Sequence, residues 1–139
     1  MQSAPIRLSP AQTLVITAST PERLEIEATW TTGGGPPPMH WHPRQHESFE
    51  VLSGELTVGL GDAAPRLLQA GETLEVPPRT AHRMWNAGDE SCSARWVITP
   101  ALRTADMFRA IERSRSRLGT AARLLISYRA EFRLGAPRS

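Results

Sequence analysis

The first hundred residues carry the two-residue alternation of apolar and polar side chains that is typical of half-buried β-strands. In residues 23–30, RLEIEATW, the apolar side chains of Leu24, Ile26, Ala28 and Trp30 fall on one face, with glutamate and threonine between them. Further strands of this kind are expected at 12–18, 48–54, 55–60, 66–70, 72–76, 81–86 and 93–99. Glycine, proline, asparagine or aspartate separates most of these segments. Many short strands at this spacing predict an antiparallel sandwich or barrel.

After residue 100 the apolar spacing changes to three and four residues, which is typical of amphipathic helices. Thr104 is expected to cap a first helix. The buried face of this helix would hold Met107, Phe108 and Ile111. The apolar stripe of a second expected helix consists of Leu118, Ala121, Leu125, Tyr128 and Phe132. Gly135 and Pro137 follow and are expected to end it.

Length and composition fit a single globular fold. The chain has 139 residues, of which 40% are hydrophobic, which is enough for one hydrophobic core. We expect residues 1–100 to form a barrel domain and residues 101–139 a helical extension that packs on the barrel or on a dimer partner. The longest apolar runs are far shorter than the roughly 20 residues of a membrane helix, so no membrane partner is expected.

The N-terminus and the cysteine content favour a cytoplasmic location. The segment MQSAPIRLSPAQ lacks the basic stretch followed by an apolar stretch that marks a secretion signal. A single cysteine, Cys92, cannot form an internal disulfide. Both features are typical of proteins in a reducing compartment.

The basic residues are all arginine, and they are unevenly distributed. Residues 101–139 hold nine arginines and three acidic residues, whereas the first hundred residues have a net charge of −4. A basic C-terminal part could bind nucleic acid. Arginines on the solvent-facing sides of helices give the same count, and no aromatic stacking surface or recognised nucleic-acid module accompanies them. We therefore expect no nucleic-acid partner.

Three of the four histidines lie close together in residues 33–54, GGGPPPMHWHPRQHESFEVLSG. If His40 and His42 lie on a strand, the two-residue period places both imidazoles on the same face, where they could bind one metal ion. Glu47 follows a short turn and could bring a carboxylate beside them. His82 stands forty residues later, on another expected strand, and could supply the fourth ligand.

With these residues in place, the sequence resembles the cupin superfamily. The first cupin motif, G-xxxxx-H-x-H-xxxx-E-xxxxxx-G, is matched at Gly34, His40, His42, Glu47 and Gly54. The second motif, G-xxxxx-P-x-G-xx-H-xxx-N, is matched at Gly71, Pro77, His82 and Asn86. Arg79 stands where the second motif has a turn glycine, which affects the local turn or places an arginine at the pocket entrance. Two motifs in the correct order, within about residues 20–100, are much more specific than either alone.

The resemblance implies an all-β, antiparallel jelly-roll barrel followed by about two helices. It also implies one divalent transition metal bound by His40, His42, Glu47 and His82. Nitrogen and oxygen ligands of this kind suit Mn, Fe, Ni, Cu or Zn, and the sequence does not choose among them. A small-molecule ligand or substrate would bind at the metal, and a homodimer is usual among such proteins.

Three functions are compatible with such a site. The first is a dioxygenase-like oxidoreductase acting on a small organic molecule, in which Glu47 stays a ligand or briefly accepts a proton. The second is an isomerase, lyase or hydrolase that uses the ion only as a Lewis acid. The third is a non-catalytic binding or sensor protein. Whether the chain is an enzyme stays open, because one fold hosts many activities.

Several other residues are candidates for supporting positions. His46 could substitute as a ligand, orient Glu47 or carry a proton near the metal, but strand alternation places it opposite Glu47, which favours a solvent-facing loop position. Asn86 could close the second motif through hydrogen bonds. The expected pocket residues are Trp30, Phe49, Val51 and Met84, all of which would also fit a simple core.

Overall fold

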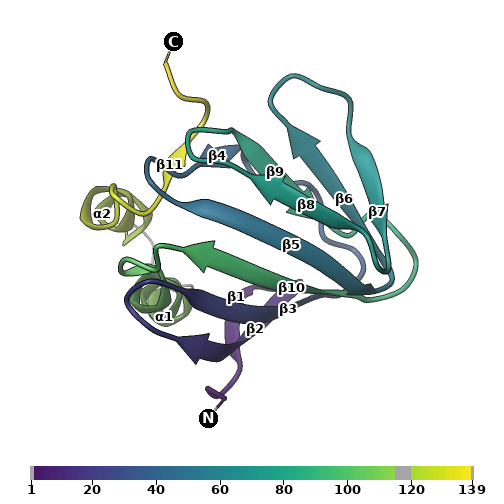
Figure 1. Cartoon of the computed structure of the whole chain (residues 1–139), viewed down its shortest axis with the longest axis horizontal. Coiled ribbons are helices and arrows are strands. Elements are labelled where there is room, and N and C mark those ends of the chain that lie inside the picture. Colours follow the sequence, from purple (N-terminus) through teal and green to yellow (C-terminus); the bar gives the residue numbers. More distant parts are fainter. Residues whose placement is uncertain (1, 115–119, 139) are drawn as a thin grey trace.

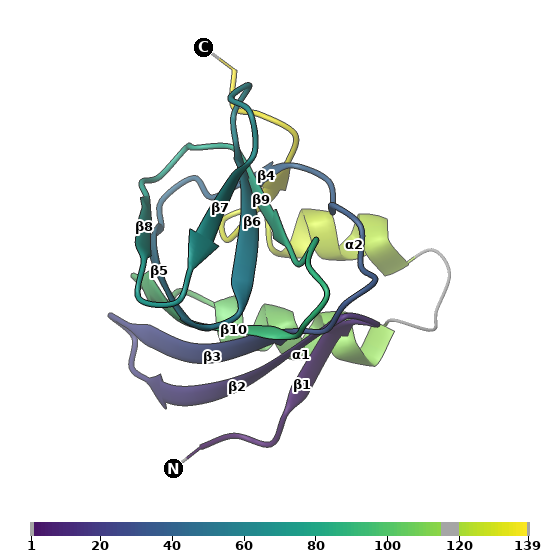
Figure 2. The same cartoon turned by 90° about the vertical axis from the view of Figure 1, so that its right-hand side faces the viewer.

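Two antiparallel β-sheets face each other in the computed structural model, which describes residues 2–114 and 120–138 (Figure 1). The strands are β1 (Ile6–Ser9), β2 (Gln12–Ser19), β3 (Leu24–Trp30), β4 (His40–Trp41), β5 (His46–Ser53), β6 (Glu55–Leu60), β7 (Arg66–Gln69), β8 (Thr73–Val76), β9 (His82–Trp85), β10 (Cys92–Thr99) and β11 (Arg133–Leu134). One sheet has the order β1-β2-β3-β10-β5-β8, and the other has the order β11-β4-β9-β6-β7. Figure 2 shows the sheets curving around a common interior. The predicted all-β barrel is confirmed.

The core lies between the sheets and follows the alternation of the strands. In β3 the side chains of Leu24, Ile26, Ala28 and Trp30 are buried, as expected. They belong to the same hydrophobic cluster as side chains of β6 in the opposite sheet, such as that of Val58. Burial of these apolar side chains is the main source of the free energy that holds the two sheets together.

The tight turn between β5 and β6 requires a glycine. Gly54 has a φ of +73°, which L side chains rarely adopt. A Cβ atom there would lie 2.5 Å from the carbonyl oxygen of Ser91. The glycine that ends the first sequence motif is therefore needed for both its backbone angle and its lack of a side chain.

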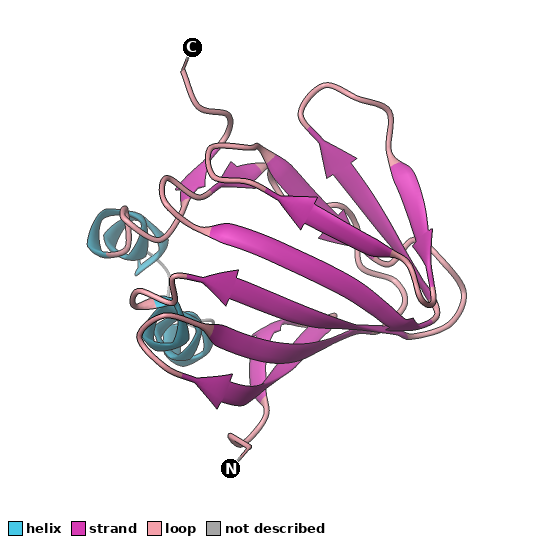
Figure 3. Ribbon diagram, in the orientation of Figure 1, coloured by secondary structure: helices cyan, strands magenta, loops and turns pink. Residues whose placement is uncertain are grey.

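The first helix begins where the sequence predicts. Helix α1 (Thr104–Ser114) starts at Thr104 and buries Met107 and Phe108, while Ile111 is partly buried against the core. The helix packs against β1, where the backbone amide of Arg7 donates to a carboxylate oxygen of Glu112 at 2.6 Å. Figure 3 shows both helices, in cyan, together on one side of the molecule. The helix therefore packs directly on the barrel.

The second helix differs from the prediction. Helix α2 (Thr120–Ser127) ends before Tyr128, and the chain then turns and forms β11, so that Phe132 lies outside any helix. Leu118 and the side chain of Ala121 fall outside the described residues. Strand pairing at the sheet edge replaces the last helical turn, and β1 and β11 are two short strands that the alternation did not reveal. Neither α1 nor α2 is long and apolar enough to cross a membrane.

Candidate metal centre

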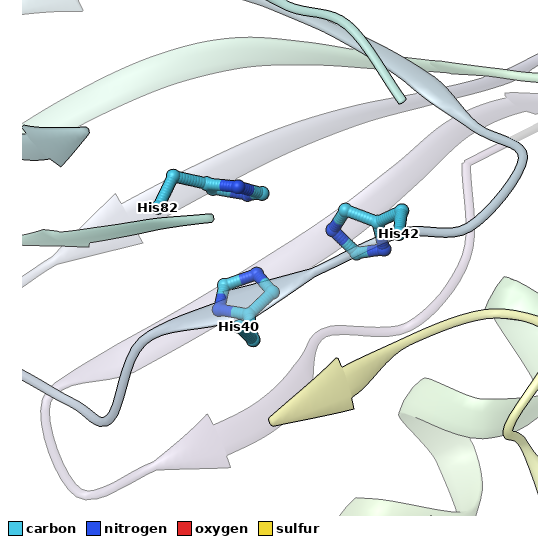
Figure 4. A group of neighbouring side chains, drawn as sticks. All are labelled: His40, His42 and His82. Carbon is cyan, nitrogen blue, oxygen red and sulfur yellow. The ribbon is translucent and has the colours of Figure 1, made fainter. Parts of the chain in front are cut away.

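Neighbouring strands bring three imidazoles together. His40 lies on β4 directly opposite His82 on β9, and His42 follows immediately after β4 ends. The ring centroids are 4.3 Å apart for His40 and His82, 5.1 Å for His40 and His42, and 5.2 Å for His42 and His82. One nitrogen from each ring lies within 4.8 Å of the other two. Figure 4 shows the three rings gathered in one place, which suggests a metal site.

Glu47 places a carboxylate beside two of these rings. Its side chain on β5 is fully buried, and its Oε1 atom lies 2.9 Å from Nε2 of His42 and 2.9 Å from Nε2 of His82. The geometry is not that of hydrogen bonds: in the described part of the chain, Oε1 of Glu47 and Nε2 of His42 are buried without a hydrogen-bond partner. These polar atoms therefore lie close together without hydrogen bonds between them.

Backbone carbonyls fix the orientation of two of the rings. Nδ1 of His42 lies 2.7 Å from the carbonyl oxygen of Glu131, and Nδ1 of His82 lies 2.8 Å from that of Thr80. A carbonyl oxygen only accepts, so each Nδ1 must donate its hydrogen. In the neutral ring the lone pair is then on Nε2, the atom that faces Glu47.

This arrangement fits a bound cation. A carboxylate oxygen and an imidazole nitrogen 2.9 Å apart repel when both carry lone pairs, unless the positive charge of a proton or a metal ion lies between or beside them. Ligand atoms that bind one ion at about 2.1 Å and at right angles lie about 3 Å apart, close to the observed separation. Three imidazole nitrogens within 4.8 Å of one another, with the Glu47 carboxylate beside two of the rings, are donors that suit a divalent transition metal.

The electrostatics of the site keep the carboxylate charged. Burial acts to raise the pKa of Glu47, but the imidazoles of His42 and His82 outweigh it and hold that pKa well below its ordinary value. Burial also acts to lower the pKa of His42, but the attraction of the Glu47 carboxylate is larger, so the pKa of His42 lies above its ordinary value. Burial and the neighbouring imidazoles lower the pKa of His40 to about 3. The cluster thus combines a buried anion with an uncharged imidazole at His40.

Trp96 holds the other oxygen of the carboxylate, a contact that the sequence analysis missed. Its indole Nε1 donates to Oε2 of Glu47 at 2.7 Å. The register of β10 against β5 places Trp96 opposite Phe49, and the two rings stack with centroids 5.4 Å apart. From sequence, Trp96 fits a packing position equally well. Only the strand register would have linked it to Glu47.

The C-terminal segment also reaches the site. Strand β11 pairs with β4, with Leu134 opposite His40 and Arg133 opposite Trp41. The carbonyl of Glu131 holds His42, and the Glu131 side chain is itself buried near the guanidinium of Arg103, at 3.4 Å. No sequence signal points to this contact, because every residue offers a carbonyl.

Gln45 is a second residue that the sequence analysis missed. Its side chain is buried in the turn between His42 and Glu47, and its amide nitrogen donates to the carbonyls of Pro100 and Ala101, both at 3.0 Å. The same nitrogen reaches the hydroxyl of Thr104, at 2.8 Å. Gln45 therefore fixes the start of α1 relative to the metal centre.

His46 and Asn86 lie away from the histidine cluster. Within the described residues, the His46 side chain has no hydrogen bond or ring contact with the three other histidines. Asn86 is buried, and its amide donates to the carbonyls of Trp30 and Glu90 while its oxygen accepts from the amide of Gly88. The contacts of Asn86 order the turn after β9.

Arg79 keeps the left-handed backbone of the glycine that it replaces. Its φ is +63°, and its backbone amide donates to the carbonyl of His42 at 2.8 Å. Its guanidinium lies over the ring of Trp41 at 5.0 Å and donates to the carbonyl of Arg138 at 3.1 Å. Arg79 is not among the residues that line the cavity beside the histidines, and its position at the pocket entrance stays a prediction. The left-handed turn directs its side chain toward the C-terminal segment.

A cavity of about 260 Å³ adjoins the three imidazoles. Trp30, Phe49 and Met84 line it as expected. Val51 does not, and this expectation is corrected: Val51 is 1% exposed and lies in the core cluster. It shares a face with Phe49, but it lies two residues further along β5, about 7 Å from Phe49 and further from Glu47.

Comparisons with known proteins agree with the architecture. The family model described as the cupin domain matches residues 27–98. The chain is also similar to KdgF from Halomonas sp., with a TM-score of 0.62 and 21% identity over 70% of this chain and 88% of that one. At this identity the similarity shows the fold alone.

Several curated relatives carry enzyme names. Oxidoreductase macE of Penicillium terrestre is 41% identical over 76 residues, which cover 53% of this chain and 29% of macE. Oxalate oxidase 1 of Hordeum vulgare is 37% identical over 62 residues, which cover 40% of this chain and 31% of that protein. The chain thus spans less than a third of the length of either relative.

Proposed function

The chain belongs to the cupin domain family, and from that premise we propose that it is a metal-dependent oxidoreductase acting on a small organic molecule bound beside the metal. The ligands would be Nε2 of His42, Nε2 of His82, a ring nitrogen of His40 and Oε1 of Glu47. One observation carries the proposal: buried donor atoms of His42 and Glu47 without hydrogen-bond partners converge beside a cavity. The names of distant relatives support oxidoreductase chemistry.

A redox-active divalent ion at this site would supply Lewis acidity and exchange of single electrons with substrate or oxygen. The protein contributes orientation and exclusion of water. The carbonyls of Glu131 and Thr80 keep two imidazoles in the metal-binding tautomer. Trp96 holds Glu47 in place, and Glu47 is fully buried and does not line the cavity. Glu47 is therefore better placed to bind the ion than to exchange a proton with a molecule in the cavity.

Elemental analysis tests the metal site. We expect about one transition-metal ion per chain in the wild-type protein, and less than about a tenth of that in His42→Ala, which removes one buried ligand. His46→Ala is the matched control, because the same substitution in the same motif removes an imidazole that does not contact the cluster. Equal metal content in the wild type and His42→Ala would refute the metal site.

Oxygen consumption tests the chemistry. The protein is loaded with Fe(II) or Mn(II) and mixed with small hydroxy, keto and aromatic acids in an oxygen electrode. Substrate-dependent oxygen uptake that is lost in His42→Ala is the expected result. Equal turnover without oxygen, with Zn(II) in the site, would replace this proposal with Lewis-acid isomerase or lyase chemistry.

A further inference from the structure

The cavity beside the imidazoles has walls from two parts of the chain. Phe49 and Trp96 belong to the barrel, whereas Phe108 and Ile111 belong to α1 and Phe132 follows α2. The rings of Trp96 and Phe108 meet at 5.4 Å between centroids, with an interplanar angle of 53°. The C-terminal extension therefore forms part of the space in which a ligand would lie.

The side chains that line the cavity are mostly apolar. Apart from the three imidazoles, Gln12 and Thr104 supply the only polar side chains among the described residues that line the cavity, and no carboxylate or guanidinium lines it. The Thr104 hydroxyl already accepts from the Gln45 amide. A second charged group on a ligand would thus find no charged side chain in the lining, and its burial there would be unfavourable. An apolar body would instead gain from burial.

The size and shape of the cavity narrow the ligand class. An apolar protein cavity of about 150 Å³ is large enough to bind benzene. The space of about 260 Å³ therefore accommodates one ring with short substituents. Aromatic walls such as Trp96 and Phe49 favour a ring through stacked or edge-to-face contacts.

We propose that the cavity binds a monocyclic aromatic molecule whose single oxygen-bearing group points at the histidine cluster. This inference rests on the proposed function, because it takes the cluster as the metal site. The proposed ligand differs from oxalate, the substrate in the name of the oxalate oxidase relative, because oxalate is a small dianion with no apolar body.

A matched series of carboxylates tests the ligand class. Acetate, benzoate and terephthalate are titrated by calorimetry into the Mn(II)-loaded full chain. The three probes share one carboxylate; benzoate adds a ring, and terephthalate adds a second charge. We expect benzoate to bind at least about tenfold more tightly than acetate, because the ring is buried. Terephthalate should bind at least about tenfold more weakly than benzoate, because its second carboxylate finds no partner.

Two variants test whether the ligand binds in this cavity. Ile111→Asp puts a carboxylate in the wall and should weaken benzoate binding at least about tenfold while the metal content stays unchanged. Ile126→Asp is the matched control, because Ile126 is 70% exposed on α2 and does not line the cavity, and its affinity for benzoate should stay at the wild-type value. Unchanged benzoate affinity in Ile111→Asp would overturn the inference.

The outcomes separate the two proposals. A metal-loaded wild-type chain that binds acetate or terephthalate as tightly as benzoate overturns this inference and leaves the metal site standing. A chain that binds no transition metal overturns the proposed function, and the inference with it. If Ile111→Asp does not fold, the carboxylate series on the wild-type protein decides the question by itself.

Discussion

The ligand-bearing strands and the C-terminal segment serve the same site by different means. Strands β4, β5 and β9, together with His42 directly after β4, supply the side chains whose nitrogen and oxygen atoms lie close together. The segment after residue 100 supplies the carbonyl of Glu131, the pairing of β11 with β4, and apolar side chains of the cavity wall. The strands hold the candidate ligands, whereas the C-terminal segment holds the His42 ring and forms part of the cavity wall beside it.

The ligand-bearing strands and the C-terminal segment also differ in the contacts that hold them in position. Sheet pairing places His40 opposite His82, so the ligand positions follow from the register of the barrel itself. Apart from the two-residue pairing of β11 with β4, the C-terminal segment is held by individual contacts, such as the hydrogen bond from Tyr128 to Asp106, at 2.5 Å, and that from the Gly135 amide to the Met39 carbonyl, at 2.8 Å. We therefore expect changes in the C-terminal segment to weaken the site without removing a ligand.

Removal of residues 131–139 should have the largest effect among the changes that spare all four ligands. The truncated chain loses the carbonyl that orients His42 and the strand that pairs with β4. Loss of such supporting contacts typically lowers metal affinity by about 10- to 100-fold. Titration with Mn(II) or Zn(II) in a competing chelator measures the change.

A shorter deletion is the control for this truncation. Removal of residues 136–139 leaves Glu131 and β11 in place, so metal affinity should stay close to the wild-type value. Circular dichroism verifies that both truncated chains keep their β structure. If removal of residues 131–139 leaves both the fold and the metal affinity unchanged, the C-terminal segment does not support the site.

Trp96→Phe should have an intermediate effect, because it keeps an aromatic ring but removes the donor to Glu47. The carboxylate oxygen Oε2 then stays buried without its hydrogen bond, which costs about 1–3 kcal/mol of folding free energy. Metal affinity should fall by about tenfold, because the carboxylate is less well oriented. Urea unfolding and metal titration measure the two quantities.

Trp85→Phe is the matched control for this substitution. The Trp85 ring is only partly buried on β9 and lies under the guanidinium of Arg83, 5.5 Å from the ring centroid. The same chemical change should cost no more than about 1 kcal/mol there, without loss of metal affinity. A Trp96→Phe protein that keeps wild-type metal affinity would show that Glu47 needs no support from the indole.

The sequence predicted the fold and the group of candidate ligands because both depend on side-chain patterns. Segments such as 23–30 alternate apolar and polar residues, as a half-buried strand does. The spacing of His40, His42 and Glu47 is compatible with only a few arrangements of strands. The cupin motifs then placed His82 with them. The three histidines cluster in space because their strands pair, and the order and spacing of the two motifs are enough to indicate that pairing.

The supporting contacts could not be predicted, for physical reasons that differ from residue to residue. The Glu131 contact uses a backbone carbonyl, which every residue type has, so no residue type indicates it. The Trp96 contact depends on the register of β10 against β5. Phe132 continues the helical spacing of the apolar stripe, yet it follows a turn, because edge pairing of β11 competes with the end of α2. Local sequence patterns do not predict such tertiary contacts.

Arg79 connects the two regions and should give the smallest effect. Its backbone amide binds the carbonyl of His42, while its guanidinium contacts Trp41 and the carbonyl of Arg138. The φ of +63° is unfavourable for any residue with a Cβ atom, by about 1–2 kcal/mol. Arg79→Ala keeps this strain and loses the stacking, which is worth about 0.5–1 kcal/mol at an exposed position.

Arg79→Gly loses the same stacking but relieves the strained backbone. We therefore expect the glycine variant to be more stable than the alanine variant by about 1 kcal/mol, even after the greater freedom of glycine in the unfolded chain is counted. Metal content should be the same in both, because the amide that contacts His42 remains. The free energies of unfolding in urea give the comparison directly. If alanine is the more stable of the two, then the left-handed turn carries no strain, and the arginine side chain alone explains why this position tolerates the absence of glycine.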